Sequence, residues 1–152
     1  MNSSQKDDLH SHCLHILEEK LTNIGNEMKL IQNSANSDTK SSMGDKYETS
    51  RAMAMLEKEN MASQLKVVQD QIKVLREINI TKRSEKIELG SLVIMDNGNK
   101  YYISVSMGKM EWQNDSYLLI SPVSPAGLSM LGQKVGARIT LAKSNMLISE
   151  II

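Results

Sequence analysis

The sequence predicts an α+β protein in which a helical hairpin precedes a small antiparallel β domain. Residues 1–85 contain no proline and two of the eight glycines, whereas residues 86–152 contain both prolines and the other six glycines. Two apolar stripes with heptad spacing run through the first part. In the second part, Asn97-Gly98 separates two segments rich in β-forming residues.

The first part is predicted to form an antiparallel coiled coil. A helix from about Asp7 to Gln32 carries the first stripe, at Leu14, Leu17, Leu21, Ile24, Met28 and Ile31. A polar segment, residues 32–45, then predicts a turn. The second stripe follows, with Lys58 at one heptad position, at Ala54, Met61, Leu65, Val68, Ile72 and Leu75. The two helices are expected to pair because each buries a face that would otherwise stay in water.

The second part is predicted to be a compact sheet around one short helix. Asn97-Gly98 indicates a two-residue hairpin turn with positive φ. Further strands are expected at residues 116–121, 134–142 and 145–152, and a short helix started by proline and closed by glycine at residues 124–132. The predicted domains are therefore a hairpin at 1–80 with its turn near 38–48, a linker at 81–86, and a β domain at 87–152.

Composition limits the functional classes. The 18 basic and 18 acidic residues balance, and no basic run predicts tight sequence-independent binding to free nucleic acid. The single cysteine, Cys13, precludes an internal disulfide. No apolar segment reaches the length of a membrane span, and the polar start is not a signal peptide. We expect a cytoplasmic monomer that does not bind membranes.

Two interpretations fit the carboxylates Asp45 and Glu48. Their D-x-x-E spacing is that of a capping box at the start of a helix, where acidic groups also interact favourably with the helix dipole. However, both residues, together with Asp38, are expected at the turn of the hairpin, farthest from the β domain. A long arm with acids at its end could instead deliver carboxylates to a partner.

The chain resembles the Gre family of bacterial transcript-cleavage factors at two stretches. The family's tip pattern, approximately G-D-L-S-E-N-A-E-Y, is matched by Gly44-Asp45-Lys46-Tyr47-Glu48-Thr49. The family's S-P-x-G-x-x-L-x-G-K-x-x-G pattern is similar to "SPAGLSMLGQKVG" at residues 124–136. Lys46 and Tyr47 depart from the tip pattern, and Arg51 stands near the position of the family's Glu-Tyr pair.

This resemblance implies a coiled-coil hairpin, an FKBP-like β domain and RNA polymerase as the partner. The hairpin would enter the secondary channel, where Asp45 and Glu48 help to hold a Mg²⁺ ion shared with the polymerase; Asp38 is a further candidate. Ser124 and Pro125 would contact the polymerase, although helix-start chemistry explains them equally. The factor would not be an enzyme, would need no cofactor of its own, and would meet the RNA 3′ end only within the elongation complex.

Alternatives remain open. Because the neighbours of the tip acids depart from the family pattern, the protein could regulate polymerase from the same channel without stimulating cleavage. It could also be a coiled-coil scaffold in which the acids only stabilise a helix. His10, His12 and His15 lie close to Cys13 and make a metal site conceivable, but surface or stripe-edge positions explain them better.

Overall fold

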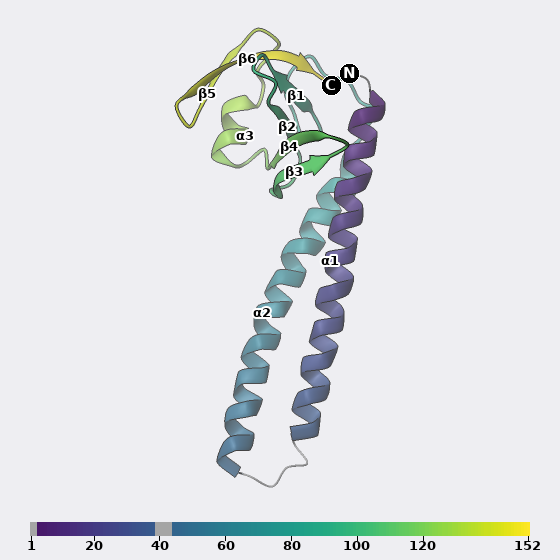
Figure 1. Cartoon of the computed structure of the whole chain (residues 1–152), viewed down its shortest axis with the longest axis vertical. Helices are drawn as coiled ribbons and strands as arrows, with labels where there is room; N and C mark the ends of the chain where they lie inside the picture. The colour runs from purple at the N-terminus through teal and green to yellow at the C-terminus, as the bar shows by residue number, and fades with distance from the viewer. Residues whose placement is uncertain (1–2, 39–43) are drawn as a thin grey trace. The chain divides into compact units, whose positions relative to one another are not determined.

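The computed structural model describes the backbone of residues 3–38 and 44–152, and the side chains of residues 4–33 and 48–152. It confirms the predicted α+β class within these ranges. Two long helices precede a six-stranded sheet, and one short helix lies in the chain between the fourth and fifth strands (Figure 1). The long helices are α1 (Ser3–Asp38) and α2 (Gly44–Glu77). No helix of the described residues is both long and apolar enough to cross a membrane.

The chain divides into two compact units. One comprises Leu14–Lys73 and is called the hairpin unit here; the other comprises Met1–Cys13 with Val74–Ile152 and is called the β unit. The division falls inside both long helices, whereas the sequence places its domain boundaries at residues 80/81 and 86/87. Those boundaries remain a prediction.

In the hairpin unit, the predicted apolar stripes form the contact between α1 and α2. Leu17, Ile24, Val68 and Ile72 are buried, and the other stripe residues of this unit are half-buried. Lys58, the polar residue in the second stripe, is exposed, and its ammonium donates a 2.6 Å hydrogen bond to the Gln32 side-chain oxygen. This bond links the two helices where the stripe lacks an apolar residue.

The helix α1 is longer than predicted. It continues to Asp38, although the polar segment from residue 32 suggested a turn. No glycine or proline occurs between Gly25 and Gly44, so nothing in this segment breaks a helix that already has several turns. The weak helix propensity of these polar residues did not end α1 before Asp38. Of the predicted turn, residues 39–43 lie outside the described part of the chain.

The β unit contains a mixed sheet with the strand order β3-β4-β2-β1-β6-β5. The strands are β1 (Leu92–Met95), β2 (Lys100–Ile103), β3 (Gly108–Trp112), β4 (Asp115–Ile120), β5 (Arg138–Leu141) and β6 (Ser144–Ile151). The β2–β4 pair is parallel, with Tyr101 opposite Leu118, whereas the other pairs are antiparallel. The sequence did not predict β3, and that strand reverses the chain so that β4 returns parallel to β2.

The hairpin at Asn97-Gly98 exists, but its turn differs from the prediction. Gly98 has φ +91° and donates its N–H to Met95 O, while Met95 N donates to Asn99 O. This is a three-residue loop whose glycine forms a bulge. Within the described residues, two successive positive φ values on non-glycine residues occur instead at Gln113–Asn114 and Ala142–Lys143. These residues form two-residue turns between β3 and β4 and between β5 and β6.

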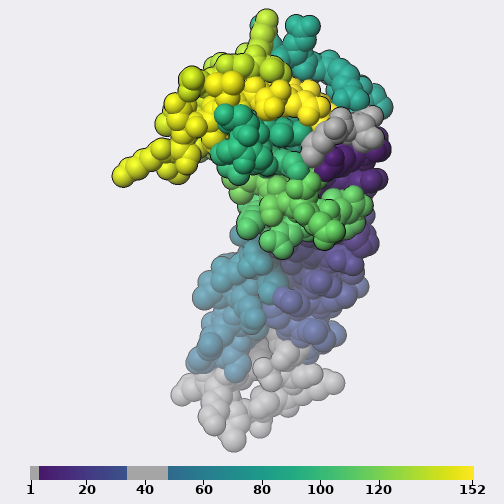
Figure 2. Space-filling view, turned by 45° about the horizontal axis from the view of Figure 1, so that its top comes forward, coloured from purple at the N-terminus to yellow at the C-terminus, as the bar shows by residue number. Residues whose placement is uncertain are grey.

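Each face of the sheet packs against helix. Tyr101 and Ile103 on β2 belong to a buried cluster with Met130 of the short helix α3 (Pro125–Met130). Tyr102, whose side chain points to the opposite face, hydrogen-bonds to His10 of α1. The end of the chain lies beside the first turns of α1 (Figures 1 and 2), where the Lys6 ammonium donates to the Ile152 carbonyl at 3.3 Å.

Candidate functional site

The acidic turn of the hairpin is the first candidate site. Asp38 is the last residue of α1, and Asp45 and Glu48 lie in the first two turns of α2. The side chains of Asp38 and Asp45 lie outside the described residues. Glu48 is described, and its side chain is exposed. Lys58, which pairs with Gln32 across the hairpin, is ten residues from Glu48, or about 15 Å along a helix.

The start of α2 bears on the capping interpretation. A capping box needs Asp45 immediately before the first helical residue, but α2 begins at Gly44 and therefore includes Asp45. A carboxylate in the first turns still interacts favourably with the positive end of the helix dipole. The backbone thus fits helix stabilisation through the dipole, and an exposed Glu48 is also available to a partner.

Exposed apolar side chains follow the tip acids on α2, and sequence reasoning did not identify them. Met53, Met55 and Leu56 each expose more than half of their surface, as does Leu30 on α1. The stripes at Ala54 and Met61 use the face of α2 that meets α1, so these side chains lie away from it. The sequence could have identified these exposed apolar residues. They occupy positions between the heptad residues, where a solvated helix usually carries polar side chains.

The segment around α3 is the second candidate site. Ser124 is the N-cap of α3: its hydroxyl accepts a hydrogen bond from Gly127 N at 3.1 Å and donates one to Ser121 O at 2.6 Å. Pro125 occupies the first turn and is exposed. Gly127 is required here because an added Cβ would collide with the Ser121 carbonyl oxygen and lie 2.9 Å from Pro122 Cα. Ser124 and Pro125 therefore start α3, as the helix-start interpretation predicts.

The same segment carries two exposed apolar side chains that the sequence analysis did not single out. Val123 is 77% exposed and Leu128 is 61% exposed, one on each side of the Ser124 cap. The cap and Gly127 hold the backbone tightly, so Val123, Pro125 and Leu128 are presented to solvent from a rigid turn. We call these three residues the α3 patch. A backbone held in this way lowers the ordering cost of contact with a partner.

The three histidines do not form a metal site. His10 is buried against Tyr102, His12 stacks on the Trp112 ring with centroids 3.8 Å apart, and His15 pairs with Glu19 at 3.2 Å on the exposed side of the helix. No group of three or more His, Cys, Asp or Glu side chains suited to a metal ion occurs in the part of the chain that the structure describes. His10 is a core residue, and its expected surface or stripe-edge position was wrong.

Burial shifts the pKa values of three side chains on α1, those of Lys6, His10 and Cys13. The pKa of His10 is lowered first by burial and then by the nearby Lys6 ammonium, and the pKa of Lys6 is itself lowered by burial. Burial raises the pKa of Cys13 to about 12, and its Sγ lies 3.7 Å from Met110 Sδ. A protonated, buried Cys13 thiol is a structural group and not a nucleophile, because the thiolate is the reactive form.

Comparisons with known proteins give a weak structural likeness. No protein-family model matches the chain, and no curated protein matches it. Two solved structures are similar at a TM-score of 0.36 and 19% identity, over 91% of this chain: "GreA factor homolog 1 (Gfh1) protein of Thermus thermophilus", covered over 94% of its length, and "the transcription factor Gfh1", covered over 92%. At this level no functional residue is transferred from either of them.

Proposed function

We propose that the protein is a Gre-type elongation factor that binds RNA polymerase, inserts its hairpin through the secondary channel and stimulates cleavage of backtracked RNA. The observation that carries the proposal is the pair Asp45 and Glu48, which stands in the first two turns of α2, the second of two long helices that pack along their apolar stripes. The motifs at residues 44–49 and 124–136, which resemble the Gre family, supply the partner and the reaction.

The dimensions of the hairpin unit support insertion into a narrow opening. Residues 14–38 of α1 form a continuous helix of about 37 Å at 1.5 Å per residue. The apolar stripes and the bond between Lys58 and Gln32 hold the two helices together. A two-helix arm of this kind is thin enough to enter a channel, and it carries its carboxylates at the end that enters.

The chemistry needs carboxylates that are free to reach a metal. Carboxylate oxygens are suitable ligands for Mg²⁺, which binds through one or two carboxylates and keeps several waters. When bound, a second Mg²⁺ in the polymerase would stabilise the attacking and leaving oxygens of the displacement. Glu48 is exposed and, with Asp45, would hold that ion from one side and orient a water; Asp38 is a further candidate. The chain by itself is therefore expected to bind Mg²⁺ poorly.

The β unit would provide the second contact with polymerase. The Gre resemblance assigns this contact to Ser124 and Pro125, and the exposed neighbours Val123 and Leu128 support it. Ser124 acts by capping α3, because both of its hydrogen-bonding roles are used within the segment. Pro125, Val123 and Leu128 would make the contact itself.

The decisive experiment is RNA cleavage in a stalled elongation complex with added factor. We expect Asp45→Asn and Glu48→Gln each to reduce stimulated cleavage about a hundredfold, as loss of a charge-stabilising group does. The neutral replacements keep the shape of each side chain. Asp70→Asn is the matched control, because Asp70 is an exposed carboxylate of α2 that pairs with the exposed Lys66 ammonium at 2.8 Å. Full cleavage by both tip variants would return the acids to a helix-stabilising role.

A second candidate function is regulation of polymerase from the same channel without cleavage. Arg51 is exposed and lies one turn after Glu48, so a positive charge stands close to the proposed ligand. Lys46 also departs from the family's tip pattern. If the wild-type factor binds polymerase and slows nucleotide addition but leaves cleavage unchanged, this function replaces the first. Failure to bind polymerase at all would leave a coiled-coil scaffold.

A further inference from the structure

Two exposed lysines lie directly opposite each other in the β unit. Lys86 and Lys134 form an isolated antiparallel bridge, and both are exposed. Backbone hydrogen bonds fix this pairing, from Ile87 N to Gln133 O at 2.9 Å and from Gly132 N to Ile87 O at 2.8 Å. Side chains that face each other across such a pair repel when their charges are alike and attract when they are opposite. The backbone thus holds two positive charges where an opposite pair would be more favourable.

The chain itself does not neutralise these two ammonium groups. Within the ranges that the structure describes, the side chains of Lys86 and Lys134 make no ion pair. The nearby Glu88 carboxylate is held by Lys82 at 3.1 Å. The two segments that the bridge joins, residues 82–88 and 132–138, contain five basic and two acidic residues, although the whole chain is neutral. We call these two segments the basic strip.

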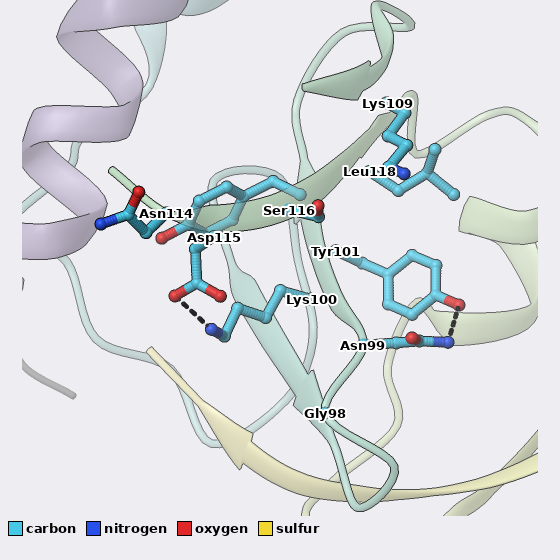
Figure 3. A pocket seen from close by; sticks show the side chains of 10 residues that line it. Gly98, Asn99, Lys100, Tyr101, Lys109, Asn114, Asp115, Ser116 and Leu118 are labelled. Atoms are coloured by element: carbon cyan, nitrogen blue, oxygen red, sulfur yellow. Dashed lines mark hydrogen bonds and ion pairs between the residues drawn. The ribbon is translucent and has the colours of Figure 1, made fainter. Parts of the chain in front are cut away.

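The pocket of the β unit differs from the basic strip in its charges. The pocket has a volume of about 450 Å³ and lies where β2, β3 and β4 meet (Figure 3). Its lining includes Asn99, Ser116 and Lys109. Positive and negative groups are paired there, Lys100 with Asp115 at 2.5 Å and Lys109 with Glu111 at 3.8 Å. An anionic partner therefore meets an excess of positive charge at the basic strip and balanced charge at the pocket.

The basic strip follows the α3 patch directly in the chain. Its second segment begins at Gly132, two residues after α3 ends at Met130, and Val135 within it is 57% exposed. Interfaces between proteins combine an apolar centre with a polar rim. The α3 patch has the composition of such a centre, and the basic strip has the composition of a positively charged rim.

We propose that the basic strip binds an acidic surface of RNA polymerase and steers the factor onto it. This inference rests on the proposed function, which supplies the partner. Exposed charges at the rim of an interface act mainly on the association rate, because complementary potentials guide the two proteins together before they touch. A carboxylate between Lys86 and Lys134 would accept charge-assisted hydrogen bonds from both ammonium groups and relieve their repulsion.

A protein surface fits the basic strip better than a single-stranded nucleic acid does. Sites for single strands combine positive charge with aromatic side chains on which the bases stack. Residues 82–88 and 132–138 contain no aromatic residue, and the strip continues from an apolar patch. Carboxylates on a protein are therefore the expected partner groups.

The test measures association of the full chain with core RNA polymerase that carries no nucleic acid, by stopped-flow fluorescence at several salt concentrations. Lys134→Glu should lower the association rate constant about tenfold at low salt, reduce its dependence on salt and change the dissociation rate little. Lys143→Glu is the matched control. Lys143 is an exposed lysine of the β unit in the turn between β5 and β6, outside the basic strip, and its substitution changes the net charge equally.

Urea unfolding of the same variants separates binding from folding. Lys134→Glu places a carboxylate opposite Lys86, so its urea midpoint should rise slightly above that of the wild type. Slower association then cannot result from a loss of structure. A lower midpoint would contradict the repulsion inferred for the lysine pair.

Three kinetic outcomes would overturn the proposal. An unchanged association rate in Lys134→Glu would leave the strip without a role. Equal slowing by Lys134→Glu and Lys143→Glu would assign the effect to overall charge. Slowing seen only with polymerase that carries DNA and RNA would make nucleic acid the partner. In each case wild-type binding and RNA cleavage are unaffected, whereas a wild-type factor that neither binds polymerase nor stimulates cleavage would refute the proposed function itself.

Discussion

The imidazole Nδ1 of His10 lies 2.7 Å from the Tyr102 hydroxyl, and this buried contact joins α1 to the middle of the sheet. The two rings meet edge to face at 6.1 Å between centroids. One residue comes from the third turn of a long helix and the other from β2, 92 positions later. The contact explains why the first turns of α1 belong to the β unit.

The stability of the β unit should fall as the pH drops below the ordinary pKa of histidine. Because burial and Lys6 lower the pKa of His10 in the folded state, and Asp7 opposes this only partly, the unfolded chain binds the proton more readily. Stability is therefore retained above about pH 6.5 and lost as the pH falls from there through the folded-state pKa. Urea unfolding measured from pH 5 to 8 tests this.

Paired histidine variants identify the group responsible for that pH dependence. His10→Gln should flatten the pH dependence and cost about 1–3 kcal/mol of unfolding free energy at pH 7.5, because a buried hydrogen-bond partner is lost. His15→Gln should leave both unchanged, since His15 is exposed and pairs with Glu19 on the surface. An unaltered slope in His10→Gln would assign the titration to another group.

Two glycine substitutions should have opposite effects on stability. Gly127→Ala should destabilise the protein by about 2 kcal/mol or more, because the new Cβ meets backbone atoms of Ser121 and Pro122 that cannot move freely. Gly25→Ala should stabilise it by about 0.5–1 kcal/mol, since no atom lies within 4 Å of the added Cβ and the helix gains propensity. Chemical denaturation of both variants measures this, and a harmless Gly127→Ala would contradict the packing described for α3.

The turn between β5 and β6 can be improved. Ala142 and Lys143 have φ values of 47° and 69°, and these left-handed conformations cost energy for residues other than glycine and asparagine. The double variant Ala142→Asn, Lys143→Gly should raise the unfolding free energy by about 1 kcal/mol. The matched control is Gly98→Ala in the turn between β1 and β2. Gly98 has φ +91°, which an alanine adopts only with strain, so this substitution should lower stability. A rise in stability for Gly98→Ala would show that φ does not govern these turns.

The α3 patch gives a prediction for partner binding. If Val123 and Leu128 contact polymerase, Leu128→Asp should weaken binding at least tenfold and leave unfolding unchanged, because the side chain is 61% exposed. Leu89→Asp is the control: Leu89 is 42% exposed and lies in the β unit, outside both the patch and the hairpin that is proposed to enter the channel. A pull-down or fluorescence titration with polymerase measures both. Equal loss in the two variants would point to general apolar adhesion.

Local rules predicted the hairpin and the cap of α3 because those features depend on neighbouring residues. The apolar heptad positions from Leu14 to Leu75 are buried or half-buried as expected. Ser124, Pro125 and the glycine that closes α3, Gly132 with φ +78°, act as the sequence indicates. The strand β3 was missed although residues 109–112, K-M-E-W, alternate between polar and apolar side chains. Four residues are the shortest alternation that indicates a strand, and the strand lies at the edge of the sheet.

The sequence by itself determined the α+β class, the two stripes and the acidic pair near the turn, since spacing along one helix or strand specifies which side chains share a face. Only the tertiary structure decided that Lys6 and His10 are buried, that β2 and β4 run parallel, and that Lys109, Ser116 and Asn99 line one pocket. Each of these depends on residues far apart in the chain, and their hydrogen bonds and strand register exist only after the sheet has formed.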